Sequence, residues 1–301
     1  MKKPKVIKLK NGILVCGDAA KILPKNVPDE SVDLVLTSPP YDELRSYKGY
    51  TFDFKAIARE LVRTLKPGGV IVWVVGDATV KGSETCSSFN QALYFKKLGL
   101  RLHDTMLWIK TNPVPGAANQ RYRGAFEYMF CFSKGKPKTF NKKEWLPKNQ
   151  MKFNEKFRLE KHGRTSYLEK GLTSSGVMKD KINEKGMDFN TGVHPNVFFY
   201  AGGTQIIKRK RGPRHPAIFP DRLAEDQIRT WTNPGDVVLD PFLGSGTSCK
   251  IAELLSREYV GIEISEEYLD GAATAIKDAE GFNQMFEPEE PQLEAVPVDF
   301  D

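Results

Sequence analysis

The feature of this sequence that most constrains its fold is an alternation of short apolar runs with longer segments of helical periodicity. Val32–Leu36 and Val70–Val75 are nearly continuous aliphatic runs bounded by breakers, which is typical of strands buried on both faces. Between them, apolar residues recur every three or four positions over Phe52–Lys66, and Pro67-Gly68-Gly69 should end this helix. Strands that are apolar throughout and alternate with helices predict an α/β fold with a mainly parallel sheet covered on both faces.

The same alternation runs through the rest of the chain except over residues 140–189, where Lys, Asn, Gly and Ser dominate. An aperiodic segment inside a regular pattern predicts an insertion. The last 21 residues hold six acidic residues and no basic one, so we expect a loose tail there. Further strands are expected at 13–16, 103–110, 127–133, 236–240 and 259–264, and further helices at 19–23, 88–98, 223–231, 247–255 and 265–277. Regular structure is expected to resume at 194–200.

Composition excludes several classes of protein. With 301 residues, 40% of them hydrophobic and 28% charged, the chain can bury a sizeable core. No apolar stretch approaches the roughly 18 residues of a membrane span, and Met1-Lys2-Lys3 is not followed by the apolar core of a signal peptide. We therefore expect a cytoplasmic protein without a membrane partner. Cys16, Cys86, Cys131 and Cys249 lie far apart, without His at ligand spacing, so neither a disulfide framework nor a metal site is expected.

Basic residues are concentrated in one part of the chain. Residues 133–214 hold 20 Lys and Arg against 7 Asp and Glu, a net charge of +13 in a chain whose total is +7. They are interleaved with aromatic residues, Asn and Gln, a composition that suits a polyanion-binding surface. This part includes the run Lys208-Arg209-Lys210-Arg211. We favour contact with nucleic acid over the alternative of a solvated charged face.

The run Thr37-Ser38-Pro39-Pro40-Tyr41 predicts a site at the carboxyl end of the Val32–Leu36 strand. Two consecutive prolines fix φ and remove two backbone donors, so the chain must leave the sheet there with free carbonyl groups. The Ser38 oxygen and the Pro39 carbonyl can accept hydrogen bonds, and Tyr41 offers a flat face. Together they suit a planar ring that carries an amino group, such as cytosine or adenine. A proline-rich turn without a ligand is the alternative.

A second candidate site is the glycine turn Asp240-Pro241-Phe242-Leu243-Gly244-Ser245-Gly246-Thr247, which follows a strand and opens a helix. The next strand ends at Glu263, whose carboxylate can accept hydrogen bonds from ribose hydroxyls, and Asp18 also follows a strand. Because glycines let a ligand approach the backbone closely, this pattern predicts an adenosine-containing cofactor. Cys249 stands where the dinucleotide fingerprint has its third glycine, which argues against NAD and FAD.

Taken together, Thr37–Tyr41 and Asp240–Thr247 resemble the two hallmark motifs of the amino-group DNA methyltransferases that use S-adenosylmethionine. The order of catalytic motif, basic region and cofactor motif is similar to the β group of that family. The resemblance spans Ile13 to about Ala279 and includes the Leu65–Gly69 turn, Phe126-Glu127-Tyr128 and His215-Pro216-Ala217.

This resemblance implies a doubly wound, Rossmann-like, mostly parallel seven-stranded sheet with an inserted target-recognition region. The strands that precede Ser38 and Gly244, although distant in sequence, should be neighbours at the centre of the sheet, so that cofactor and target base meet at the switch point. The implied divisions are a catalytic half at 1–139, a target-recognition insert with a basic linker at 140–214, a cofactor-binding half at 215–280 and an acidic tail at 281–301.

The resemblance also assigns roles to residues of the two motifs. Asp18 should contact the adenine end of S-adenosylmethionine, Phe242 should pack on the adenine, and Asp240 with Thr247 should hold the methionine end. From the charge of residues 133–214, rather than from the resemblance, Lys208–Arg211 should bind DNA. The full expected cofactor set is Asp18, Thr37, His215, Pro216, Asp240, Pro241, Phe242, Gly244, Gly246, Thr247 and Glu263, and the expected catalytic set is Ser38, Pro39, Pro40 and Tyr41.

The implied reaction is methylation of an exocyclic amino group in double-stranded DNA. Ser38 and the Pro39 carbonyl would accept hydrogen bonds from the amino group, and Tyr41 would stack on the base after it swings out of the duplex. Serine in the first position of this motif favours cytosine N4, with adenine N6 as the alternative. A non-catalytic DNA-binding protein and a nucleotide-dependent oxidoreductase are more distant alternatives. The resemblance is compatible with a monomer or a homodimer and with a cognate restriction endonuclease as partner.

Overall fold

Strands and helices alternate along the computed structural model of the protein, which describes residues 4–40, 52–112, 122, 124–141, 196–202 and 220–284. The described helices are α1 (Ala19–Asn26), α2 (Phe54–Thr64), α3 (Ser87–Lys97), α5 (Asp221–Trp231), α6 (Thr247–Leu254) and α7 (Glu266–Gln284). The described strands are β1 (Val6–Lys8), β2 (Gly12–Cys16), β3 (Val32–Thr37), β4 (Leu65–Val75), β5 (Thr79–Val80), β6 (Ser83–Glu84), β7 (Arg101–Lys110), β8 (Phe126–Ser133), β9 (Val197–Tyr200), β10 (Val237–Asp240) and β11 (Glu258–Glu263).

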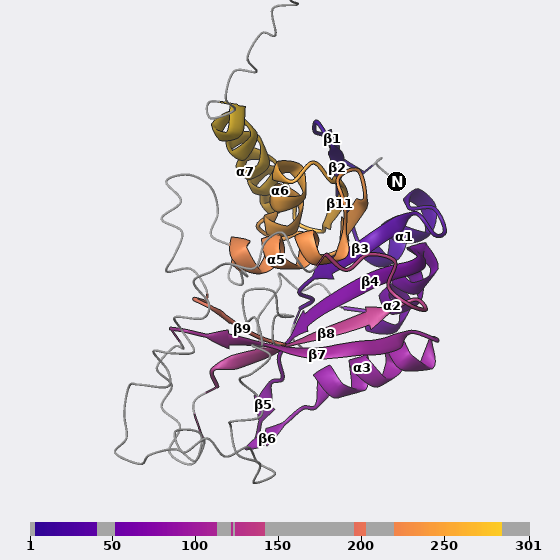
Figure 1. Cartoon of the computed structure of the whole chain (residues 1–301), viewed down its shortest axis with the longest axis vertical. Coiled ribbons are helices and arrows are strands. Elements are labelled where there is room, and N and C mark those ends of the chain that lie inside the picture. The colour runs from indigo at the N-terminus through magenta and orange to yellow at the C-terminus, as the bar shows by residue number, and fades with distance from the viewer. Residues whose placement is uncertain are drawn as a thin grey trace, which may run out of the picture.

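One large sheet organises these elements, in the strand order β1-β2-β11-β10-β3-β4-β8-β7-β9 (Figure 1). The strands from β2 to β4 run parallel to one another, β8 is antiparallel to both of its neighbours, and β9 is parallel to β7. The α/β fold class with a mostly parallel sheet is therefore confirmed. The sheet has nine described strands instead of the expected seven, because β1 and β9 extend its two edges. β1 has three residues, none of them buried, and β9 has four, and apolar runs this short do not identify a strand by themselves.

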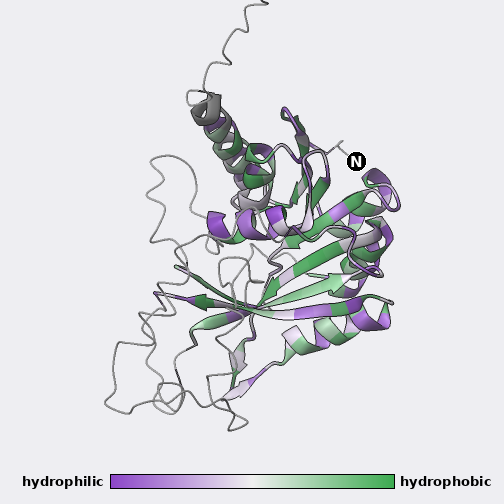
Figure 2. Ribbon diagram, in the orientation of Figure 1, coloured by the Kyte–Doolittle hydropathy of each residue, from purple (hydrophilic) through white to green (hydrophobic). Residues whose placement is uncertain are grey.

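Alternate residues of the central strands enter two separate cores. Val70, Val72 and Val74 of β4 belong to a cluster with α5, α6 and α7. Ile71, Trp73 and Val75 of the same strand belong to a cluster with α1, α2 and α3. Figures 1 and 2 show the two helical layers on opposite sides of a sheet whose strands are strongly hydrophobic. The continuous apolar runs in the sequence follow from this burial on both faces.

The centre of the sheet is the pairing of β10 with β3. Val238 lies opposite Leu34 and Leu239 opposite Val35, so the two strands are parallel neighbours although they are far apart in the sequence. The chain leaves β10 for α6 on one face and leaves β3 for α2 on the other face. Such a reversal is a topological switch point, where the carboxyl ends of adjacent strands border a ligand-binding crevice. The expected adjacency of the two motif-bearing strands is confirmed.

The expected helix at Phe52–Lys66 is shorter at both ends than its periodicity suggests. It begins at Phe54 because the Asp53 carboxylate accepts a hydrogen bond from the Ala56 amide at 3.0 Å, and it ends at Thr64. Pro67-Gly68-Gly69, expected to be a turn, lies within β4. The reason is that Gly68 donates to the Lys134 carbonyl at 2.7 Å and Lys134 donates to the Gly69 carbonyl at 3.1 Å, which extends the sheet through these residues.

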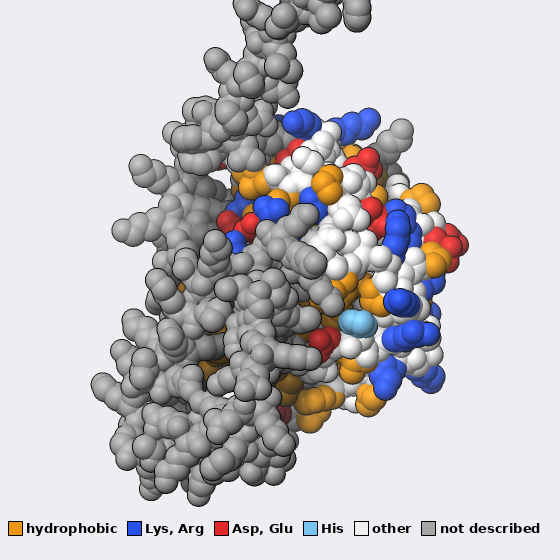
Figure 3. Space-filling view, in the orientation of Figure 1, with side chains coloured by type: hydrophobic (Ala, Val, Ile, Leu, Met, Phe, Trp, Pro, Cys, Tyr) orange, Lys and Arg blue, Asp and Glu red, His pale blue; other side chains and the backbone are white. Residues whose placement is uncertain are grey.

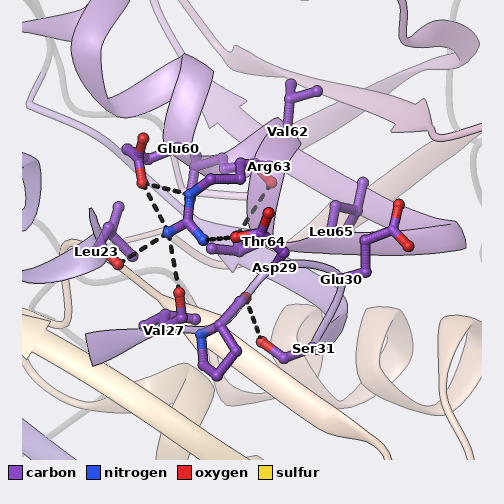
Figure 4. A network of polar contacts seen from close by, with 12 residues as sticks. Leu23, Val27, Asp29, Glu30, Ser31, Glu60, Val62, Arg63, Thr64 and Leu65 are labelled. Atoms are coloured by element: carbon purple, nitrogen blue, oxygen red, sulfur yellow. Dashed lines mark hydrogen bonds and ion pairs between the residues drawn. The ribbon is translucent and has the colours of Figure 1, made fainter. Parts of the chain in front are cut away.

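At the amino end of β3, opposite the switch point, the Arg63 side chain near the end of α2 forms a network of hydrogen bonds (Figure 4). Its guanidinium donates to the Leu23 carbonyl at 3.0 Å, to the Val27 carbonyl at 2.9 Å and to Glu60 at 2.8 Å, and it pairs with Asp29. Burial would lower the pKa of Arg63, but the hydrogen bonds to the two carboxylates raise it. This network joins α2 to the end of α1 and to the connection that leads into β3.

Exposed Lys and Arg side chains gather on the side of the molecule formed by α1, α2 and α3 (Figure 3). They include Lys21, Lys25, Lys55, Arg59, Lys96, Lys97 and Arg101.

Several expected features lie outside the described residues: Lys208–Arg211, nearly all of the 140–214 insert and the tail beyond Gln284. The expected division into domains therefore stays a prediction. Within the described part of the chain, no helix is long and apolar enough to cross a membrane.

Candidate active site at the switch point

The first expected motif leaves the sheet at the carboxyl end of β3. All six residues of β3 are buried, ending with Thr37. Ser38 is half-buried just beyond the strand, Pro39 is buried and Pro40 is half-buried. Since the prolines cannot donate to a neighbouring strand, they end the pairing at this point. Tyr41 lies outside the described residues, so its role as a stacking platform stays a prediction.

The second expected motif forms a tight turn between β10 and α6. Gly244 and Gly246 have φ angles of 52° and 82°, in the left-handed region that favours glycine. A Cβ atom on Gly246 would lie 2.8 Å from the Cβ of Ala272 on α7, which is too close. Gly246 is therefore required both by its backbone conformation and by the packing of α7 against the turn. Thr247, the first residue of α6, is buried, and its hydroxyl lies 3.1 Å from that of Ser245.

A side-chain contact links the two motifs directly. The Thr37 hydroxyl donates to Asp240 Oδ1 at 2.6 Å, and the Phe242 amide donates to the same oxygen at 3.0 Å. Asp240 Oδ2 accepts from the Ser248 hydroxyl at 2.7 Å. Burial raises the pKa of the Asp240 carboxyl to about 6, although all three hydrogen bonds act to lower it. Both oxygens of Asp240 are thus engaged within the protein, and the side chain is only 1% exposed.

Glu263 ends β11 beside the glycine turn, as expected for the acidic residue of a nucleoside site. Its carboxylate accepts from the Gly244 amide at 2.8 Å and from the Ser265 amide at 2.9 Å. Its backbone carbonyl accepts from the Gly17 amide at 2.8 Å, which places the Asp18 loop next to it. Burial raises the pKa of the Glu263 carboxyl, while the backbone hydrogen bonds oppose that shift. A carboxylate has about four lone-pair sites, so acceptor capacity is left for a ligand hydroxyl.

Asp18 and Phe242 border the same edge. Asp18 caps α1, since its Oδ1 accepts from the Ala20 amide at 3.0 Å, and Lys21 lies 3.3 Å from its Oδ2. The Phe242 ring contacts the edge of the Phe52 ring at a centroid distance of 5.3 Å, and Trp73 lies behind it at 6.3 Å. Phe52 was not expected at the site. Its apolar character had been assigned to the helix that follows it, and only the fold brings it to Phe242.

A further residue missed from the sequence is Asp77, which follows β4 next to the end of β3. It accepts from the Ser88 amide at 2.9 Å and from the Ser87 hydroxyl at 3.1 Å, so it anchors the start of α3. The signal was available, because Gly76-Asp77 repeats the strand, glycine and aspartate pattern of Gly17-Asp18. His215, Pro216 and Lys208–Arg211 lie outside the described residues, and the structure does not test their expected roles.

The residues at this edge fit an adenosine-containing cofactor. The glycine turn provides close access to the backbone, Glu263 has remaining acceptor capacity for ribose hydroxyls, and Phe242 presents an aromatic ring. The carboxyl end of β3, with the acceptor oxygen of Ser38, adjoins this turn through the contact between Thr37 and Asp240. Within the described ranges, no group of three or more His, Cys, Asp and Glu side chains is arranged to hold a metal ion.

Comparison with known proteins gives consistent results. The N6_N4_Mtase family model, described as DNA methylase, matches residues 32–275. The orphan methyltransferase M.BamHII of Bacillus amyloliquefaciens is 48% identical over 259 residues, which cover 84% of this chain and 92% of that protein. The type II methyltransferase M.BglII of Bacillus subtilis is 27% identical over 277 residues, covering 90% of this chain and 70% of that protein.

Solved structures share the fold. The PvuII DNA methyltransferase, described as cytosine-N4-specific, aligns with a TM-score of 0.62 at 22% identity, over 93% of this chain and 95% of that chain. The M1.HpyAVI–SAM complex aligns with a TM-score of 0.56 at 24% identity, over 87% of this chain and 98% of that chain. These likenesses concern the arrangement of strands and helices.

Proposed function

The chain belongs to the amino-group DNA methylase family and uses S-adenosylmethionine as its methyl donor, and from this premise we propose that it methylates the N4 amino group of cytosine in duplex DNA. The observation that carries the proposal is the position of Ser38, directly after β3 and next to the strand that leads into the glycine turn. Serine at this place favours cytosine N4 by resemblance to other members of the family. Adenine N6 is the second candidate, because a serine oxygen can accept from either amine.

The residues of the β3 end address the main difficulty of the reaction, which is the delocalised lone pair of the amino nitrogen. Hydrogen bonds from the amino group to the Ser38 oxygen and to the Pro39 carbonyl draw that nitrogen toward a pyramidal geometry. The same acceptors stabilise the positive charge that develops on it in the transition state. Bound S-adenosylmethionine supplies a methyl group already activated by a sulfonium. The protein therefore needs to orient the amino group and exclude water more than it needs a strong base.

Each half of the site has a distinct task in this proposal. The glycine turn, Glu263 and Asp18 hold the cofactor, and Phe242 packs on its adenine. Ser38 and Pro39 hold the amino group, while Tyr41 stacks on a base that has left the duplex at a cost of a few kcal/mol. Lys208–Arg211 contact DNA phosphates. A DNA substrate implies that the enzyme works where the DNA is, which is the cytoplasm in a cell without a nucleus.

Nucleoside analysis of DNA modified by this enzyme tests the proposal. A plasmid is recovered from cells that produce the full chain, digested to nucleosides and examined by mass spectrometry. We expect N4-methylcytosine, and we expect it to be absent when the cells produce Ser38→Ala at the same level. N6-methyladenine as the sole product would reverse the base assignment. N4-methylcytosine at an undiminished level with Ser38→Ala would remove Ser38 from the catalytic set.

A further inference from the structure

Backbone pairing between the two central strands stops before either of them reaches the site. β3 and β10 pair at Val238 opposite Leu34 and at Leu239 opposite Val35. On its other side, β3 stays paired with β4 as far as Thr37, which lies opposite Trp73. Beyond Val35, therefore, the separation of β3 from β10 is not set by the backbone ladder between them. The last two residues of β3, Leu36 and Thr37, thus border the crevice of the switch point without a paired residue on β10.

Three buried polar side chains connect the ends of β3 and β10 beyond this backbone pairing. Thr37 of β3 donates to Asp240 of β10 at 2.6 Å, and Ser248 of α6 lies 2.7 Å from the other oxygen of the same carboxylate. The Ser248 hydroxyl also lies 3.1 Å from the Leu36 carbonyl, so α6 reaches back to β3. Thr37 and Ser248 are 0% exposed and Asp240 is 1% exposed. We call Thr37, Asp240 and Ser248 the polar bridge.

The polar bridge is a poor device for stability alone. Burial, with a smaller contribution from the nearby Glu263 carboxylate, raises the pKa of the Asp240 carboxyl to about 6. A carboxylate buried without a paired cation costs free energy, and well-packed apolar residues in such places are often as stable or more stable. Specification of a geometry is the best-supported use of buried polar groups. The geometry at stake here is the distance between the Ser38-Pro39 corner and the glycine turn.

We propose that Thr37, Asp240 and Ser248 are positioning residues, which hold the amino-accepting corner of β3 at a set distance from the cofactor-binding turn and so align the methyl group with the target nitrogen. This proposal rests on the proposed function, because it assigns the amino group to Ser38 and Pro39. It gives the Asp240 side chain a task inside the protein, while the cofactor contacts the turn that Asp240 begins. Methyl transfer is sensitive to such placement, since a misplacement of about 1 Å can cost roughly 100-fold in rate.

The central test is Thr37→Val, which keeps the shape of the side chain and removes the hydroxyl. We expect kcat for methyl transfer to fall by roughly 10- to 100-fold. The Kd for S-adenosylmethionine, measured by calorimetry, should change less than about threefold, because the glycine turn and Glu263 are intact. Thr37→Ser keeps the hydroxyl and should restore most of the rate. Ser248→Ala should also lower kcat, and the double variant should be little worse than the poorer single variant, since both act through Asp240.

Thr64→Val is the matched control. Thr64 is also a fully buried threonine, but its hydroxyl donates to the Leu61 carbonyl of its own helix at 3.2 Å, away from the site. Loss of this bond should lower the melting temperature about as much as Thr37→Val and leave kcat unchanged. A folded Thr37→Val protein with a wild-type kcat would overturn the proposal. A loss confined to cofactor affinity would overturn it too, because Thr37 would then act as a cofactor ligand.

The assay keeps this proposal separate from the assignment of the base. Transfer of a labelled methyl group from S-adenosylmethionine to DNA is counted whichever base receives it. If adenine rather than cytosine is the acceptor, the expected effects on kcat are the same. If Ser38→Ala transfers methyl groups at the wild-type rate, the proposed acceptor corner is wrong, and the polar bridge loses the geometry that it is proposed to maintain.

Discussion

At the scale of single residues, glycines of the cofactor turn show why a short motif can carry so much structural information. Gly246 has a φ of 82° and a neighbour, Ala272, that leaves no room for a side chain. Gly99 has a similar φ of 96°, but a Cβ there would meet nothing within 4 Å. Substitutions at Gly246 and Gly99 therefore distinguish the free-energy cost of a strained backbone from the cost of displacing a packed helix.

Gly246→Ala should lower the free energy of unfolding by more than the roughly 1–3 kcal/mol that a strained backbone costs. It should also weaken binding of S-adenosylmethionine at least tenfold, since the turn must move away from α7. Gly99→Ala should show the backbone cost alone, with unchanged cofactor affinity. Chemical unfolding and calorimetric titration measure the two quantities. Equal cofactor affinity in the two variants would contradict a role for Gly246 in shaping the site.

Asp226 offers a second prediction at this scale. It is 1% exposed on α5, accepts a hydrogen bond from the Tyr200 hydroxyl and lies 3.2 Å from Arg222. Burial raises the pKa of its carboxyl to about 6, whereas an unfolded chain would show about 3.8. The native state therefore binds more protons than the unfolded state between these values, so this group lowers stability as the pH rises through them.

Asp226→Asn removes that dependence. Relative to the wild type, the variant should gain roughly 1–2 kcal/mol of unfolding free energy between pH 5 and pH 8. Urea unfolding at the two pH values measures the difference. Asp278→Asn, on the exposed side of α7, is the control for loss of a carboxylate from a helix. A stability difference between Asp226→Asn and the wild type that does not vary with pH would refute the assignment.

At the scale of elements, the two ends of β3 are held in different ways. The carboxyl end carries the polar bridge, and the amino end is reached through the connection that Arg63 secures to α2. The guanidinium donates to the Val27 carbonyl in that connection and to the Leu23 carbonyl in the last turn of α1, which are main-chain groups that the sheet does not satisfy. Arg63 thereby joins α1 to α2 near the amino end of β3, away from the site at its carboxyl end (Figure 4).

Arg63→Ala should lower the free energy of unfolding by about 1–3 kcal/mol, because two main-chain carbonyls lose a charged donor. The rate of methyl transfer, measured well below the melting temperature, should be unchanged, since the site lies at the carboxyl end of β3 and Arg63 lies near its amino end. Arg59→Ala is the control on the same helix. Its side chain is exposed and donates to the Tyr94 hydroxyl at 3.1 Å, so its loss should cost little. A drop in kcat for Arg63→Ala without a drop in stability would argue against a purely structural network.

At the scale of the whole molecule, we expect positive charge to contribute to DNA binding. Replacement of Lys208–Arg211 by Ser should weaken DNA binding and make it less dependent on salt, because each lost phosphate contact releases about one counterion fewer. Titrations at several salt concentrations measure the slope. Exchanging Lys96 and Lys97 for Ser is the control, since both are exposed basic side chains of helix α3 and do not belong to the proposed DNA-binding run. Equal slopes before and after the change at Lys208–Arg211 would place that run outside the interface.

The sequence alone was sufficient to predict the layering of the molecule and the two motifs. Burial on both faces of β3, β4 and β10 favours apolar residues at most positions, and left-handed turns favour glycine, so both leave local signals. The boundaries of α2 and β4 were less accurate, because Asp53 and the contacts of Gly68 with Lys134 decide them. The edge strands β1 and β9 were not predicted, because runs of three and four residues are too short to identify a strand.

Only the tertiary structure decided which side chains meet. Thr37 and Asp240 are separated by 203 positions, and no local pattern indicates that one hydroxyl donates to the other carboxylate. Phe52 reaches Phe242 for the same reason, since this contact depends on how the start of α2 packs against the turn after β10 and not on the neighbours of Phe52 in sequence. Local conformational preferences act over a few residues and can be read along the chain. Contacts between distant residues depend on the order of the strands, which the chain acquires only when both faces of the sheet are covered.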